Sequence, residues 1–140
     1  MASYGLQLAQ VAERMGFDLA ASSVKTFMTA AEPVSASKRA RIEALWGAEL
    51  YDQFGTTEGS FMASESECHD GMHYWTDMFD LEVIDENTRE PVPEGETGIL
   101  VMTPYWNNEM TPFLRWDTGD YVSYHDKGQT DGPLSIYPMI

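Results

Sequence analysis

The sequence predicts an α/β protein, in which a partial doubly wound strand-helix-strand unit precedes a β-rich part that forms a meander or a small barrel. The spacing of apolar residues changes along the chain from a helical period to short β-rich runs. Turn residues separate these runs. The 140 residues are enough for one domain, and 43% apolar with 12% aromatic residues is typical of a chain with a packed core.

The chain is expected to begin with a helix. Between Ser3 and Gly16 the apolar residues fall three or four positions apart, which places them on one helical face: Tyr4, Leu8, Val11, Ala12 and Met15. Gly16 is the expected stop. A β-rich run at residues 24–31 is the next element, and Pro33 must end it because proline cannot donate to a strand ladder.

A second helix and a second strand complete the predicted doubly wound unit, which we assign to residues 1–59. Ser35 can cap this helix, whose apolar residues include Ile42 and Trp46, and Gly47 is the expected left-handed terminator. Residues 50–54 then return to extended structure.

Residues 60–140 are assigned to a β-rich part. Its expected strands are residues 72–75, 79–84 and 99–102. In the second of these, Phe79, Leu81 and Val83 share one face. The expected turns and loops are residues 85–89, 91–98 and 125–133, which are rich in glycine, proline or short polar side chains.

Charge and cysteine content exclude several classes of protein. Eight basic against 23 acidic residues give a formal charge of −15, so nucleic acid and an anionic membrane surface are not expected partners. Cys68 is the only cysteine, which rules out an intrachain disulfide. The chain has no signal-peptide pattern at its start and no run of 18 apolar residues, so we expect a cytoplasmic location.

The first segment with chemical content runs from Tyr51 to Gly59. An aromatic side chain at a strand end can stack on a purine, and Gly55 lets the backbone approach phosphate. Thr57 can donate to that phosphate, and Glu58 can hold Mg²⁺. These nine residues also fit a strand that a Gly-Thr turn ends, with no ligand involved.

The second segment runs from Leu114 to Asp120. Its Thr-Gly-Asp sequence indicates a sharp turn between two strand-like runs that presents the Asp120 carboxylate. A carboxylate there can accept hydrogen bonds from both hydroxyls of a ribose, as an acidic residue does in dinucleotide folds. The alternative is a β-turn with a solvated aspartate.

Together these segments resemble the adenylate-forming (AMP-binding) superfamily. The matching stretches, in order, are Ala30-Ala31-Glu32-Pro33, Tyr51-Asp52-Gln53-Phe54-Gly55-Thr56-Thr57-Glu58, Gly95-Glu96-Thr97-Gly98-Ile99-Leu100-Val101 and Leu114-Arg115-Trp116-Asp117-Thr118-Gly119-Asp120. Within the superfamily the chain is most similar to phenylacetate-CoA ligases, through Ser3-Tyr4-Gly5-Leu6, Glu67-Cys68, Asp70-Gly71-Met72-His73 and residues 85–93. The resemblance spans residues 3–124.

The resemblance implies the fold of the family's large N-terminal domain and an ATP-dependent ligase that converts an aryl carboxylic acid to acyl-AMP and then to a CoA thioester. ATP, Mg²⁺ and CoA are the implied cofactors and co-substrates. The implied catalytic residues are Thr57, at the α-phosphate, and Glu58, at Mg²⁺. The implied cofactor-binding residues are Ala31, Glu32, Pro33, Tyr51, Asp52, Phe54, Gly55, Thr57 and Asp120, with Phe54 stacking where the family usually has tyrosine.

The chain departs from the family pattern at two places. Ala30 replaces a usual glycine, and Trp116-Asp117 stands where Tyr-Arg is common, which brings a negative charge toward the nucleotide. The family's phosphate loop and its C-terminal lysine domain are not among these 140 residues. We therefore expect a middle fragment that is inactive alone and prone to self-association or homodimer formation, and a non-catalytic nucleotide-binding or interaction module is the alternative.

Zinc is a further alternative that the residues raise. Cys68 and His73 could supply two ligands, whereas a closed structural site needs four. His69 adjoins Cys68 in the sequence, and His125 lies in an expected loop. We expect no zinc.

Overall fold

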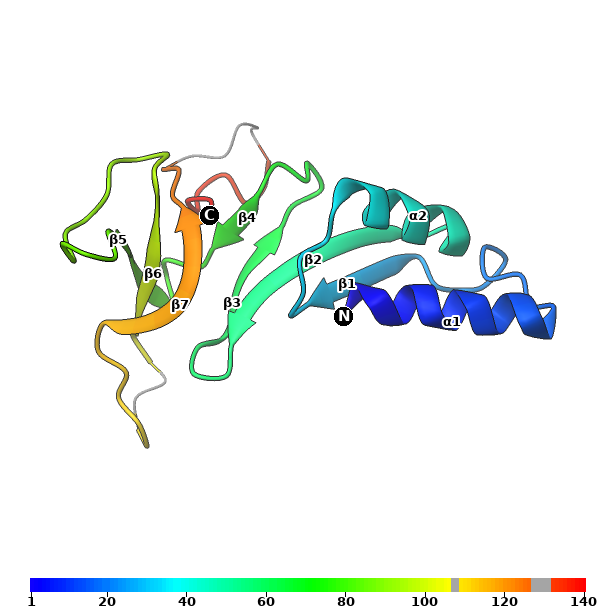
Figure 1. The fold of residues 1–140 in the computed structure, drawn as a ribbon, viewed down its shortest axis with the longest axis horizontal. Helices are drawn as coiled ribbons and strands as arrows, with labels where there is room; N and C mark the ends of the chain where they lie inside the picture. Colours follow the sequence, from blue (N-terminus) through cyan, green and yellow to red (C-terminus); the bar gives the residue numbers. More distant parts are fainter. Residues whose placement is uncertain (107–108, 127–131) are drawn as a thin grey trace. The chain divides into compact units, whose positions relative to one another are not determined.

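The computed structural model describes residues 1–106, 109–126 and 132–140, and the chain divides into two compact units, Met1–Gln53 and Phe54–Ile140 (Figure 1). The boundary between the units falls within the strand at residues 49–56, whereas the sequence analysis places the division after Gly59. Each unit has its own buried core.

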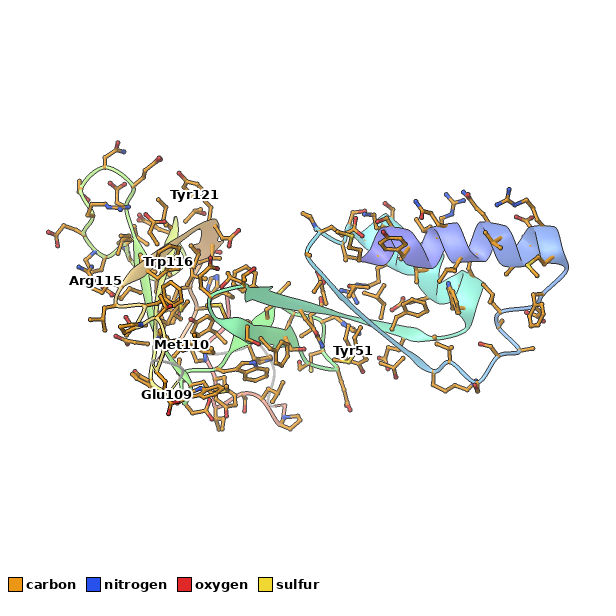
Figure 2. All side chains as sticks on the ribbon, turned by 90° about the horizontal axis from the view of Figure 1, so that it is seen from below. Tyr51, Glu109, Met110, Arg115, Trp116 and Tyr121 are labelled. Carbon is orange, nitrogen blue, oxygen red and sulfur yellow. The ribbon has the colours of Figure 1, made fainter. Side chains whose placement is uncertain are left out.

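The first unit is built around a parallel strand pair with a helical crossover. Its elements are α1 (Ala2–Met15), β1 (Thr26–Ala30), α2 (Ala36–Trp46) and the greater part of β2 (Glu49–Thr56). β1 pairs with β2 in parallel, from Thr26 opposite Glu49 to Ala30 opposite Gln53. Both helices lie on one side of this pair (Figure 2). The predicted strand-helix-strand unit is therefore confirmed.

The helix ends follow the predicted local chemistry. The Ser35 hydroxyl accepts a hydrogen bond from the Lys38 backbone N–H at 3.3 Å, which satisfies one of the donors that the start of α2 leaves open. Gly47 ends α2 at φ 60°, and Gly16 ends α1 at φ 71°, both in the left-handed region. All three terminal assignments are confirmed.

Of the apolar face that the sequence predicts for α1, only Ala12 is buried. Tyr4, Leu8 and Met15 are exposed, whereas the buried residues of α1 are all small: Ala2, Gly5, Ala9 and Ala12. Close approach explains the inversion, since a Cβ on Gly5 would lie 3.3 Å from the Phe27 ring. The Trp46 indole also donates a 3.0 Å hydrogen bond to the Gly5 carbonyl.

The second unit is antiparallel. It contains β3 (Ser60–Glu65), β4 (Met72–Tyr74), β5 (Phe79–Ile84), β6 (Thr97–Pro104) and β7 (Trp116–Ser123). β3 pairs with β4, and β5, β6 and β7 form a three-stranded meander. The core residues are Met62, Ala63, Tyr74, Phe79, Leu100 and Met102. The sequence analysis missed β3. It also predicted a loop at residues 125–133, of which residues 127–131 lie outside the described part of the chain.

The Thr-Gly-Asp segment is a β-bulge inside β7, not the predicted turn between two strands. Val101 faces Asp117 and Ile99 faces Tyr121, so Leu100 alone stands opposite residues 118–120. Gly119 adopts φ 77°, which glycine tolerates without strain. The Thr118 hydroxyl donates to the Leu100 carbonyl at 2.9 Å and replaces a lost ladder bond. The bulge keeps Asp120 on a strand and leaves it exposed.

No helix in the described part of the chain is long and apolar enough to cross a membrane.

Candidate functional site

The turn between β2 and β3 is fixed by its own residues. A Cβ on Gly55 would lie 2.0 Å from the Ser60 carbonyl oxygen, so only glycine fits where the two strands meet. The Thr56 hydroxyl accepts a 2.9 Å hydrogen bond from the Gly59 backbone N–H. Thr56 is thereby committed to the turn, and its neighbour Thr57 remains exposed.

Thr57 and Glu58 open onto a cavity of about 630 Å³ in the second unit. Its other described lining residues are Trp106, Glu109, Met110, Thr111 and Phe113. Figure 2 shows Glu109 and Met110 side by side in the segment that joins β6 to β7. The structure thus places the predicted catalytic pair on one wall of a cavity.

The opposite wall was not found from the sequence. Phe113 is held by an edge-to-face contact with Trp116, with ring centroids 4.9 Å apart, and it also packs against the core. Trp106 and Met110 are exposed large apolar side chains in a polar segment. In the sequence the only signal for them is two large apolar residues in an otherwise polar stretch, and their exposure, which the structure shows, is what indicates a function.

The cavity combines two kinds of chemistry. Thr57, Glu58 and Glu109 offer hydroxyl and carboxylate oxygens, which are the donors that Mg²⁺ prefers. Trp106 and Phe113 offer apolar and aromatic surface. The residues therefore fit a ligand with a metal-bound anionic end and an apolar end.

The aromatic residue of the motif is partly committed to the core. Phe54 is half-buried and packs against the core cluster of the second unit. Gly55 beside it is exposed, which is consistent with close approach of a ligand to the backbone.

Asp120 stands apart from these residues. Its side chain is exposed, and its backbone N–H donates to the Thr118 hydroxyl at 3.2 Å. It is not among the described residues that line the cavity. The bulge sets the position of Asp120 on β7. The Asp117 carboxylate supports the geometry of the bulge, because it accepts a 3.0 Å hydrogen bond from the Gly119 N–H.

The charge of Asp117 is compensated. Its second carboxylate oxygen pairs with the Arg89 guanidinium at 2.8 Å. Just before β7, Arg115 forms a two-pronged ion pair with Glu82 of β5, at 2.9 and 3.0 Å. The negative charge that the sequence analysis places near the nucleotide at Asp117 is therefore paired with an arginine.

In the first unit, Glu32 links two helices. One carboxylate oxygen accepts from the Ser3 backbone N–H at 2.6 Å and from the Ser3 hydroxyl at 2.8 Å, and the other pairs with Lys38 at 3.3 Å. The hydrogen bonds from Ser3, assisted by Lys38, lower the pKa of Glu32 from 4.5 to about 2. Ala31 precedes it at φ 66°, a left-handed conformation that is unusual for alanine, and Pro33 follows it on the surface.

Tyr51 and Asp52 lie side by side on β2. Asp52 is buried and accepts a hydrogen bond from the Thr29 hydroxyl at 3.0 Å, directly across the parallel pair. Tyr51 is half-buried. The contact of Asp52 with Thr29 gives it a structural role in joining β1 to β2.

The zinc candidates lie in different surroundings. Cys68 is exposed, whereas His73 is buried in β4. The backbone of Met139 forms bridges with both His73 and His125, and the His69 ring contacts the Glu65 carboxylate at 3.1 Å. Within the described ranges no group of three His, Cys, Asp or Glu side chains is placed to hold a metal ion.

The fold and the cavity define a segment of an adenylate-forming CoA ligase. In a solved structure of a 2-hydroxyisobutyryl-CoA ligase, in complex with 2-HIB-AMP and CoA, the matching region is 29% identical, with a TM-score of 0.87 over 100% of this chain and 33% of that one. The chain is similar in sequence to phenylacetate-CoA ligases, at 38% identity over 121 residues to that of Aromatoleum evansii and 33% over 122 residues to that of Escherichia coli.

Each of these two curated relatives matches 84% of this chain, and the chain spans about a quarter of their length, 27% and 28%. A benzoate CoA ligase from Burkholderia xenovorans shares the fold over 73% of the chain, with a TM-score of 0.54 and 24% identity. No protein-family model matches the chain.

Proposed function

We propose that this chain is the acyl-adenylate-binding segment of an ATP-dependent acid-thiol ligase, which activates an aryl carboxylic acid as acyl-AMP and transfers the acyl group to CoA. The observation that carries this proposal is the cavity onto which Thr57 and Glu58 open together. The similarity to phenylacetate-CoA ligases supports it.

The two polar residues have separate tasks in the proposal. The Thr57 hydroxyl donates to an α-phosphate oxygen, and it is available because Thr56 supplies the hydroxyl that holds the turn. The Glu58 carboxylate holds Mg²⁺, which would neutralise phosphate charge when bound. Both residues lie on a short, sterically fixed turn, so little reorganisation accompanies binding.

The apolar wall favours an aryl acid. Trp106 and Phe113 lie on the same cavity as the polar pair, so an acyl group attached to the α-phosphate would reach aromatic surface. Flat aromatic groups pack well against such side chains, with a gain of about 0.5–1.5 kcal/mol beyond burial alone.

A chimera tests the proposal. The matching segment of the Escherichia coli phenylacetate-CoA ligase is replaced by this chain, and acid-dependent ATP–pyrophosphate exchange is measured. We expect exchange by the chimera and none by the 140-residue chain alone, which spans about a quarter of the length of these relatives. Glu58→Gln in the chimera should raise the Mg²⁺ concentration that gives half-maximal rate, while Glu96→Gln, an exposed change just before β6, should not.

The chimera also separates the enzyme from the non-catalytic alternative. A folded chimera that binds ATP without exchange would favour a binding module, and equal Mg²⁺ curves for Glu58→Gln and its control would reject the metal assignment. The ion pair of Asp117 with Arg89 supports the enzyme over the non-catalytic module.

A further inference from the structure

Two contacts from one turn hold β7 on either side of the Thr-Gly-Asp bulge. Before the bulge, the Arg89 guanidinium pairs with the Asp117 carboxylate at 2.8 Å. After the bulge, the Tyr121 hydroxyl donates a 2.7 Å hydrogen bond to the Glu86 carboxylate. Glu86 and Arg89, which we call the clamp, both belong to the turn at residues 85–90. One short segment thus brackets the bulge from both ends.

The register of the sheet explains how this turn reaches β7. Ile84, the last residue of β5, pairs with Ile99 of β6, and Ile99 pairs with Tyr121 of β7. Tyr121 therefore lies in the row of residues nearest the turn. Asp117 pairs with Val101, two residues further from the turn, which is roughly 7 Å along the strand. Only a long side chain spans that distance, and the arginine of the turn supplies one.

The turn that carries the clamp is held by its own hydrogen bonds. One carboxylate oxygen of Asp85 accepts from the Asn87 and Thr88 N–H groups, at 2.9 and 2.8 Å. The Arg89 N–H donates to the Asp85 carbonyl at 3.0 Å, and the Asp85 N–H donates to the Glu90 carbonyl at 2.9 Å. Arg89 adopts φ 60°, in the left-handed region that favours glycine. A strained arginine at this position points to a role for its side chain.

Asp117 connects the clamp to the bulge itself. One of its oxygens pairs with Arg89, and the other accepts a 3.0 Å hydrogen bond from the Gly119 N–H. The next N–H, that of Asp120, donates to the Thr118 hydroxyl at 3.2 Å. A carboxylate fixed at one oxygen is less free to rotate away from its second contact. Arg89 therefore stabilises the geometry of the bulge through Asp117.

We propose that Glu86 and Arg89 are positioning residues for Asp120, which holds the ribose in the proposed nucleotide site. This inference rests on the proposed function, because it takes a nucleotide to bind at Asp120. The Asp120 carboxylate is exposed and has no hydrogen-bond partner among the described residues, so the backbone of the bulge sets where it lies. Holding both ends of the bulge reduces the range of positions that the carboxylate occupies, and with it the entropy that ribose binding must remove.

The effect of the clamp on nucleotide affinity should be modest. The paired side chains of Arg89 and Asp117 are 54% and 36% exposed. Because exposed contacts are weak, loss of either clamp contact should weaken ATP binding by about two- to fivefold, less than loss of Asp120 itself. The loss should fall on the contact with the ribose hydroxyls, so 2′-deoxy-ATP should be affected less than ATP.

Hydrogen exchange of the 140-residue chain tests whether the clamp holds the bulge. Arg89→Gln removes one contact, and Tyr121→Phe removes the other with the loss of a single oxygen atom. We expect each variant to exchange the Gly119 N–H about two- to fivefold faster, because this donor is released when the bulge opens. Arg115→Gln is the matched control, since it breaks another exposed ion pair, whose partner is Glu82 and not a residue of the bulge.

Nucleotide preference of the chimera tests whether the clamp acts through Asp120. Dissociation constants for ATP and 2′-deoxy-ATP are measured by calorimetry for both clamp variants, for Arg115→Gln and for Asp120→Ala. We expect the preference for ATP to fall in Arg89→Gln and Tyr121→Phe and to stay unchanged in Arg115→Gln. A merely structural role would weaken both nucleotides equally and leave the preference as it is.

The two measurements separate this proposal from the proposed function. Unchanged exchange of the Gly119 N–H in both clamp variants would show that the clamp does not hold the bulge. Faster exchange with an unchanged preference for ATP would overturn the proposal alone, provided that Asp120→Ala abolishes the preference in the same chimera. If Asp120→Ala leaves the preference intact, the ribose assignment fails and the proposal fails with it. Tyr121→Phe keeps the test decisive should Arg89→Gln fail to fold.

Discussion

Arg89 donates a 2.8 Å hydrogen bond to Asp117, and this contact joins the turn after β5 to the strand that carries the Thr-Gly-Asp bulge. The two residues are 28 positions apart in the sequence. Arg89 has φ 60°, so the end of its turn is in the left-handed region. The pair balances the negative charge of Asp117, three residues before Asp120.

We expect the coupling between Arg89 and Asp117 to be small and sensitive to salt. The side chains are 54% and 36% exposed, and exposed pairs contribute about 0.2–1 kcal/mol. A double-mutant cycle with Arg89→Gln and Asp117→Asn, measured by urea unfolding of the second unit at low and high salt, checks this. A coupling that does not fall with salt would mean that the pair is shielded from solvent.

The first unit could be predicted almost completely, because its signals are local. Ser35, Gly47 and Gly16 act through bonds and dihedral angles that neighbouring residues determine. The packing face of α1 could not be predicted, since it depends on how closely Phe27 and Ile42 approach Gly5. Periodicity identifies an apolar face, but steric fit decides which face is buried.

Acid should selectively weaken the first unit through Glu32. Its pKa is lowered in the folded chain to about 2, from an ordinary value of 4.5, so the carboxylate stabilises the fold above pH 4.5. This contribution is lost as the pH falls from 4.5 through 2, because the proton then binds to the folded form as well. Glu32→Gln should reduce stability at neutral pH, and the difference from wild type should shrink across that window.

Trp46 is the single tryptophan of the first unit, so its fluorescence reports this transition. Glu13→Gln, on the exposed surface of α1, is the matched control and should show no comparable pH-dependent difference. A Glu32→Gln difference that stays constant down to pH 2 would show that the Ser3 and Lys38 contacts do not stabilise the charged form.

Substitution of the two adjacent threonines of the turn should affect different properties, stability for Thr56 and activity for Thr57. Thr56→Val removes the acceptor of the Gly59 N–H and should destabilise the second unit by about 0.5–1.5 kcal/mol. Thr57→Val, at an exposed site, should leave stability nearly unchanged and instead lower exchange by the chimera. Chemical unfolding and ATP–pyrophosphate exchange of both variants check this, and equal stability losses would contradict the division of roles.

The candidate site was predictable only in part, for a reason that β3 and β7 illustrate. Met62, Ala63 and Ser64 are consecutive buried residues, so β3 has no alternating pattern that a sequence would reveal. Thr118-Gly119-Asp120 suits a turn and a bulge equally well, and only the register with Leu100 decides between them. Trp106 and Met110 reach the cavity through tertiary structure, which no local motif specifies.

Asp120→Ala in the chimera should weaken ATP binding by roughly 10- to 150-fold, which corresponds to the ~1.5–3 kcal/mol of a hydrogen bond to a charged acceptor. The bulge fixes this carboxylate on β7, so the substitution removes the acceptor and leaves the strand in place. Calorimetric titration with ATP and with 2′-deoxy-ATP checks the role, because loss of a ribose contact should affect the deoxy nucleotide less. Asp80→Ala, an exposed change on β5, is the control and should bind both nucleotides normally. If Asp120→Ala weakens both nucleotides equally, Asp120 acts through the backbone of the bulge and not through the ribose.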